Sequence, residues 1–177
     1  VLSMTGLGVK LTSLIISLSD NNIWPALILT GIACLLLGME VPTTAAYVIC
    51  VSVAGPALVD MGLELLQVHL FVFWFALLST ITPPVCGTVF IASGMVSENW
   101  LKVSLTSMSL GIGLYFIPLS MIANDAVIKL DSNFLYAIIA FFKIAVSLVL
   151  LSYAFISNNL IILKIIAFGL GMFVMFV

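Results

Sequence analysis

Two long apolar runs, each interrupted near its middle by proline, constrain the fold of this chain more than any other feature. The first run covers residues 25–59 and contains LLLGMEVPTTAAYV, Leu35 to Val48. The second covers residues 69–95 and contains STITPPVCGTVF, Ser79 to Phe90. Proline lacks an N–H group and clashes with the preceding helical turn, so both motifs predict a broken helix. Within a membrane, broken backbone is tolerated only where it is buried in protein or lines a cavity.

The composition predicts an all-α integral membrane protein. Of 177 residues, 64% are hydrophobic and only 7% are charged, whereas soluble domains average about 25% charged residues. A membrane span needs about 20 residues, so the length allows five or six membrane-embedded segments, with the lipid bilayer as the surroundings. The net charge of −2 and the absence of arginine argue against nucleic-acid binding. The sequence shows no signal peptide and starts and ends in a way that suggests a piece of a longer chain.

Residues 25–60 are predicted to form a re-entrant helical hairpin. One straight helix over residues 25–59 would be about 52 Å long, and the hydrocarbon core is about 30 Å thick. Two complete crossings would need about 40 residues and a turn. We therefore expect one arm at Pro25–Leu37, a tip at Gly38–Pro42 and a second arm at Thr43–Val59, with both ends on one side of the membrane.

Residues 61–96 are predicted to form a discontinuous transmembrane helix. Thr82-Pro83-Pro84 lies near the centre of the apolar run and separates two half-helices, roughly Leu70–Thr80 and Val85–Met95. Each half would be about 16 Å long. Together they would cross the membrane once.

Three further spans and one amphipathic helix complete the expected organisation. Residues 1–24 predict an amphipathic helix, at the membrane interface or packed on a bundle, and a turn. Its apolar face is formed by Leu7, Leu11, Leu14, Ile15 and Leu18. Residues 97–132 predict a transmembrane helix at Leu101–Ile122 and a polar connection, and the polar loop Ser97–Trp100 is suited to cap that helix. Residues 133–177 predict two C-terminal transmembrane helices, the last one truncated.

The two breaks predict a site for a cation and a carboxylate. A helix C-terminus presents carbonyl oxygens, which attract cations, and a helix N-terminus presents N–H groups, which attract anions. Carbonyl and hydroxyl oxygens suit Na⁺. The predicted Na⁺ ligands, largely backbone carbonyls, are Gly38, Glu40, Thr43, Thr80, Thr82 and Pro83; the predicted substrate-binding residues are Thr43, Thr44, Ser79 and Thr82. The alternative is that both motifs are proline kinks in ordinary spans.

Three ionisable residues in apolar surroundings have two interpretations each. Glu40 is either an ion ligand or protonation site, or a group solvated in a watery vestibule. His69 either caps or contacts the interface, or takes part in coupling. Lys143, near the middle of a predicted span, either snorkels or pairs with a carboxylate elsewhere.

The remaining side chains do not predict an enzyme. Cys34, Cys50 and Cys86 are an odd number of cysteines without C-x-x-C spacing, and we interpret them as small buried residues. The sequence contains no nucleophile–base set, phosphate loop or metal signature. No cofactor is expected apart from Na⁺ as a coupling ion.

Four motifs resemble the large membrane subunit of TRAP transporters, most closely the fused type that works with TAXI-type binding proteins. They are TGLGVKLTSLI (Thr5 to Ile15), LLLGMEVPTTAAYV, HLFVFWFALLSTITPPV (His69 to Val85) and the small-residue helix that follows. The resemblance covers roughly residues 1–123. By motif, Gly38, Pro42, Thr43 and Thr44 correspond to the hairpin tip, and Thr82, Pro83 and Pro84 to the break in the discontinuous helix. Glu40 departs from the family, in which a small residue is usual.

The resemblance implies a multi-pass permease of the bacterial inner membrane that imports an organic acid, such as a dicarboxylate, together with Na⁺. It implies a TAXI-type extracytoplasmic solute-binding protein and a small TRAP membrane subunit as partners. It also implies an elevator mechanism with two inverted repeats, of which this chain holds the second. The alternatives are a non-transporting assembly or anchor module and a channel-like pore.

Overall fold

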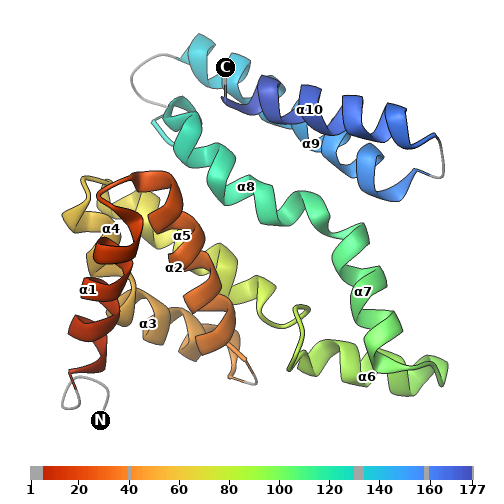
Figure 1. Ribbon diagram of the computed structural model, residues 1–177, viewed down its shortest axis with the longest axis horizontal. Helices are drawn as coiled ribbons and strands as arrows, with labels where there is room; N and C mark the ends of the chain where they lie inside the picture. The colour runs from red at the N-terminus through yellow and green to blue at the C-terminus, as the bar shows by residue number, and fades with distance from the viewer. Residues whose placement is uncertain (1–5, 40, 130–133, 158–159, 177) are drawn as a thin grey trace. The chain divides into compact units, whose positions relative to one another are not determined.

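The computed structural model describes residues 6–39, 41–129, 134–157 and 160–176, and most of these residues are helical. No β-strand occurs in these residues, so the predicted all-α fold is confirmed. The helices in Figure 1 are α1 (Leu7–Ser19), α2 (Ile23–Leu37), α3 (Thr43–Val53), α4 (Gly55–Asp60), α5 (Leu65–Leu78), α6 (Gly87–Val96), α7 (Trp100–Leu110), α8 (Ile112–Ala123), the short 3-10 helix η1 (Asp125–Val127), α9 (Phe134–Ile156) and α10 (Ile161–Phe176). The chain divides into two compact units, Val1–Ser104 and Leu105–Val177, and the boundary lies within α7.

The first unit is built around α2, α3 and α5, which pack against one another. The α2–α5 contact is close because Gly31 has no side chain: a Cβ there would lie 3.0 Å from the ring of Phe75. One turn further along α2, the Cys50 thiol of α3 donates to the Cys34 carbonyl at 3.6 Å. Leu27, Leu58, Phe71 and Val72 are almost completely buried in this unit.

Helix α1 packs on α2, α3 and α4, but not with the whole face that the sequence predicts. Ile15 is 4% exposed, whereas Leu14 and Leu18 are 51% and 67% exposed. The Thr12 hydroxyl donates to the Val53 carbonyl at 3.4 Å, which helps to set the rotation of α1. A polar contact across the interface therefore directs part of the apolar face away from the protein.

The first apolar run is helical up to Leu37 and helical again from Thr43, which are the residues expected on either side of Pro42. The predicted second arm is not continuous, because α3 ends at Val53 and α4 begins at Gly55. Pro56, which occupies the first turn of α4, has no N–H group to continue the hydrogen bonding of α3. The predicted second arm, Thr43–Val59, thus consists of two helices.

The second apolar run is non-helical between Leu78 and Gly87, around the Pro83–Pro84 peptide bond, which is cis. Helix α5 begins at Leu65, five residues before the start expected from the sequence. Its start is fixed by a capping box in which the Glu64 and Gln67 side chains bind each other's backbone N–H groups. His69 consequently lies inside α5 and does not cap it.

The second unit contains α8, α9 and α10, and α9 packs along both of its neighbours. A Cβ at Gly171 would lie 3.1 Å from the Leu151 side chain and 3.2 Å from the Ser147 carbonyl. The absence of a side chain at this position allows α10 to approach α9 closely.

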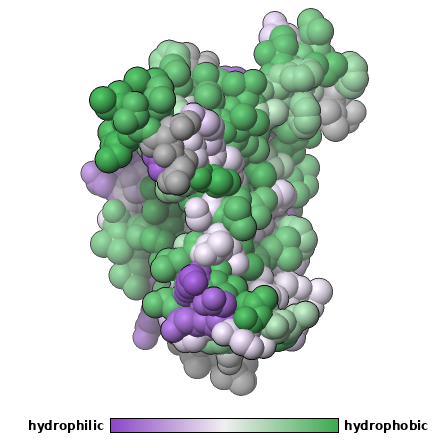
Figure 2. Space-filling view, turned by 90° about the vertical axis from the view of Figure 1, so that its right-hand side faces the viewer, coloured by the Kyte–Doolittle hydropathy of each residue, from purple (hydrophilic) through white to green (hydrophobic). Residues whose placement is uncertain are grey.

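One described helix, α9, is by itself long and apolar enough to cross a membrane. Helices α7 and α8 pass the same test together but are bent by 42°. The predicted transmembrane helix at Leu101–Ile122 is therefore divided in two, because the backbone leaves the helical conformation at Gly111. The other apolar helices in the described residues are shorter. Figure 2 shows hydrophobic side chains over most of the face in view, as expected for a surface in contact with lipid.

Candidate functional site at the two helix breaks

The two helix breaks meet at Gly38 and Ser79. The Ser79 hydroxyl lies 3.0 Å from the Gly38 carbonyl and 2.7 Å from the Ala76 carbonyl, and Ser79 is only 1% exposed. A Cβ at position 38 would lie 2.5 Å from the Ser79 hydroxyl oxygen and 2.9 Å from its Cβ. The end of α2 therefore approaches the end of α5 in a way that only glycine permits at position 38.

Side-chain hydroxyl groups donate hydrogen bonds to the backbone carbonyls at and just after the end of α5. Thr82 donates to the Leu78 carbonyl at 2.7 Å, and Thr80 donates to the Leu77 carbonyl at 2.8 Å. Thr88 reaches back from α6 to the Thr80 carbonyl at 2.6 Å. A helix C-terminus leaves its last carbonyls without intrahelical donors, but hydroxyl groups bind those of Leu78 and Thr80 in this conformation.

The break is accordingly capped by its own threonines. Each of these hydroxyl groups donates its single proton to a carbonyl and keeps lone pairs on its oxygen. The hydroxyl oxygens are therefore still chemically able to bind a cation.

The predicted site residues differ in burial. Ser79 and Thr82 are buried, Gly38 is buried, and Thr80 and Pro83 are half-buried. Thr43 is half-buried and Thr44 is exposed at the start of α3; within the described residues no hydrogen bond joins either of them to the second break. Glu40 lies outside the described residues.

The helices that follow the breaks start without a side-chain cap. Pro42 precedes α3 and Cys86 precedes α6, and neither side chain accepts a hydrogen bond from its helix. The first backbone N–H groups with a partner are that of Ala46, which donates to the Pro42 carbonyl, and those of Val89 and Phe90, which both donate to the Cys86 carbonyl. The preceding N–H groups of the first turns have no intrahelical acceptor and are suited to bind an anion.

Two polar contacts near the breaks were not predicted. Tyr47 of α3 shares a hydrogen bond with the Nδ1 atom of His69 on α5. Tyr47 and His69 lie in two different motifs that resemble the family, and nothing else in the sequence indicates that they form a pair. Ser104 of α7, which is fully buried, contacts the backbone of Ile81 and the thiol of Cys86. Nothing in the sequence distinguishes Ser104 from the other serines of α7.

The structure also places the three cysteines and Lys143. Cys34, Cys50 and Cys86 are completely buried, as predicted. Lys143 donates to the side-chain oxygen of Asn124 at 3.0 Å, a neutral partner rather than a carboxylate.

A family model described as "Tripartite ATP-independent periplasmic transporter, DctM component" matches residues 1–136. Comparisons with curated proteins and with solved structures find no match. The matched residues include both helix breaks, while α10 and all but the first turn of α9 lie beyond them. This family is a component of membrane transporters and not a family of enzymes, and its large permease subunit is the one that the motifs resemble. The chain belongs to the DctM family of TRAP transporter permease components.

Proposed function

We propose that this chain forms half of the ion and solute site of a Na⁺-coupled TRAP permease, which imports an organic acid across the bacterial inner membrane. The observation that carries the proposal is the contact between Ser79 and Gly38, residues 41 positions apart in the chain. It joins the carbonyl end of α2 to the carbonyl end of α5. Two helix C-termini of the same polarity then face one region, which favours a cation.

The proposed Na⁺ ligands are oxygens at these two ends. Ser79, Thr80 and Thr82 donate their protons to carbonyls and keep oxygen lone pairs for an ion. The Gly38 carbonyl also accepts a hydrogen bond from the Val41 N–H, at 3.4 Å. This hydrogen bond is longer and weaker than the one from Ser79, so an ion would replace it most easily. Pro83, Thr43 and Glu40 complete the proposed ligand set.

The proposed solute is a carboxylate, bound by the first turns of α3 and α6. The uncapped N–H groups there supply hydrogen-bond donors of the kind that bind anions. Thr43 and Thr44 at the start of α3 would add hydroxyl donors. Ser79 and Thr82 at the other break would donate to the solute only in a conformation in which their protons leave the Gly38 and Leu78 carbonyls. No metal or further cofactor enters this proposal apart from the coupling ion.

The lengths of the helices support a re-entrant hairpin and a discontinuous span. Helix α2 has 15 residues and α3 has 11, about 22 and 16 Å at 1.5 Å per residue. Neither reaches across a hydrocarbon core of about 30 Å. Broken helices around a site near the middle of the membrane are the general design of secondary transporters, and we propose an elevator movement of this element.

The partners follow from the family. A TRAP permease works with a periplasmic binding protein and a small membrane subunit. We propose in addition that the binding protein is of the TAXI type and that the small subunit is fused to this permease.

The test is uptake by the permease reconstituted in liposomes together with its binding protein, with labelled mono- and dicarboxylates as solutes. We expect uptake that requires both an inward Na⁺ gradient and the binding protein. A channel-like pore would equilibrate the solute without either. A non-transporting module would give no uptake under any condition, and either result would contradict the proposal.

A further inference from the structure

One buried hydroxyl group holds the two flanks of the second break. Ser104 of α7 is 0% exposed. Its oxygen lies 3.3 Å from the Ile81 carbonyl, before Pro83 and Pro84, and 3.7 Å from the Cys86 sulfur, after them. A serine hydroxyl has one proton to donate and lone pairs to accept. It can therefore donate to Ile81 and accept from the Cys86 thiol at the same time.

These two contacts set the distance between functional ends of two helices. Ile81 follows directly on the hydroxyl-capped end of α5, where Thr82 covers the Leu78 carbonyl. Cys86 is the N-cap residue of α6. Ser104 is thus attached to the carbonyl side of the break through one bond and to the N–H side through the other.

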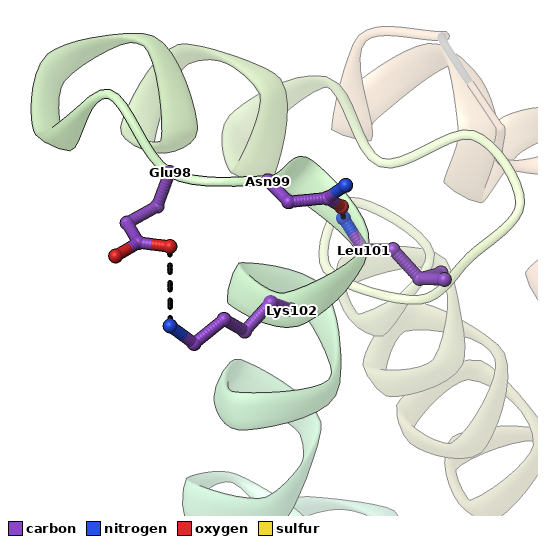
Figure 3. A network of polar contacts seen from close by, with 4 residues as sticks. All are labelled: Glu98, Asn99, Leu101 and Lys102. Carbon is purple, nitrogen blue, oxygen red and sulfur yellow. Dashed lines mark hydrogen bonds and ion pairs between the residues drawn. The ribbon is translucent and has the colours of Figure 1, made fainter.

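The start of helix α7, which carries Ser104, is stabilised by interactions outside the break (Figure 3). The Asn99 side chain accepts a hydrogen bond from the Leu101 N–H at 2.9 Å. It therefore caps the helix, as expected from the polar sequence Ser97–Trp100. Glu98 and Lys102 form an ion pair of 3.1 Å across the same turn. The ring of Trp100 lies 5.1 Å from that of Phe90, which ties the start of α7 to α6. Ser104 therefore lies one turn after a capped helix start that contacts α6.

We propose that Ser104 is a positioning residue of the transport site: without touching ion or solute, it fixes the spacing of the cation-binding and anion-binding halves of the second break. The proposal rests on the proposed function. Removal of the hydroxyl leaves the helices intact and loosens the connection between Ile81 and Cys86. Both ligand affinities depend on that connection.

The first experiment measures the rate at which N-ethylmaleimide modifies Cys86, in a permease with Cys34→Ala and Cys50→Ala. Ser104→Ala should raise the rate about tenfold, the factor for the loss of one or two net hydrogen bonds. Ser120→Ala is the matched control, since Ser120 is equally buried and its hydroxyl binds only the Ile117 carbonyl of its own helix. The control should leave the rate unchanged.

The second experiment measures uptake kinetics in liposomes. Ser104→Ala should raise the Na⁺ concentration for half-maximal uptake and the solute KM about tenfold, with a smaller effect on the maximal rate per folded protein. A merely structural role would lower the amount of folded permease and leave both concentrations unchanged. The effects of Ser104→Ala and Cys86→Ala should be non-additive, because the two side chains share one interaction.

Equal Cys86 labelling in Ser104→Ala and Ser120→Ala would overturn the proposal, as would unchanged Na⁺ and solute affinities. Because folding can fail in the alanine variant, Ser104→Thr is the second variant; it keeps the hydroxyl and should retain slow labelling. Uptake without Na⁺ in the parent permease would instead contradict the proposed function. In that case the labelling rate and the solute KM still decide the role of Ser104.

Discussion

The ammonium group of Lys143 donates a 3.0 Å hydrogen bond to the side-chain oxygen of Asn124. The amide nitrogen of the same Asn124 donates to the carbonyls of Met175, at 2.9 Å, and Ser120, at 3.2 Å. Asn124 therefore connects α9, α10 and α8 through one amide. A lysine in an apolar span is held by a neutral group that both accepts from it and donates onward.

Replacement of Asn124 by alanine should destabilise the second unit. The half-buried ammonium of Lys143 loses its acceptor and the Met175 carbonyl loses a donor, at a cost of about 1.5–3 kcal/mol for a hydrogen bond to a charged group. Thermal unfolding of the permease in detergent measures the effect. The double variant Lys143→Met with Asn124→Ala should be less destabilised than the sum of the single variants. Strict additivity would show that the two residues do not interact.

Gly38→Ala should reduce uptake by about 5- to 150-fold, because even a methyl group at position 38 overlaps the Ser79 hydroxyl. Close overlaps of this kind cost about 1–3 kcal/mol, and about 1.4 kcal/mol is a factor of ten. The assay is Na⁺-driven uptake in liposomes, normalised to inserted protein. Gly94→Ala in α6 is the control, since no atom lies within 4 Å of the added methyl group there. Equal loss in both variants would mean that the substitution acts through general helix effects.

The double variant Thr43→Val with Thr82→Val should abolish Na⁺-dependent uptake and leave membrane insertion intact. Valine keeps the shape of threonine and removes the hydroxyl oxygen, so the proposed cation loses two ligands. Uptake at increasing Na⁺ concentrations in reconstituted vesicles is the measurement. A Na⁺ dependence equal to that of the parent would remove both residues from the site.

A cysteine introduced at Val41 should react with a water-soluble thiol reagent from one side of the membrane in each conformational state. In the proposed mechanism, the tip of the re-entrant hairpin lines an aqueous path that opens to alternate sides. The background must lack Cys34, Cys50 and Cys86. Complete protection from both sides in every state would place the tip in packed protein and exclude it from the transport path.

The positions of the breaks were predictable because the effect of proline on a helix is local. Pro42 and Pro83–Pro84 mark the ends of helices within a few residues, and Asn99 caps α7 as its polar loop suggested. Pro56 has the same effect between α3 and α4, which the predicted second arm at Thr43–Val59 did not include. The early start of α5 was missed because Glu64 stands where a capping box usually has serine or threonine.

The contacts between the breaks were not predictable at the level of atoms. That Ser79 would face Gly38, or that Tyr47 would face His69, depends on the rotation of each helix about its axis. A run that is apolar all round gives no preferred face, so periodicity does not fix this rotation. Which oxygens bind Na⁺ and which donors bind the solute stay predictions.

The contact between Gly38 and Ser79 also restricts how the family can vary. Position 38 can gain a side chain only where position 79 loses one, because the two share a single volume next to the Cys34 carbonyl. Among homologues, alanine at position 38 should accompany glycine at position 79, and the two positions should mutate as a correlated pair. An engineered exchange, Gly38→Ala with Ser79→Gly, would then restore packing but not the hydroxyl group, which separates the steric requirement of this contact from its chemical one.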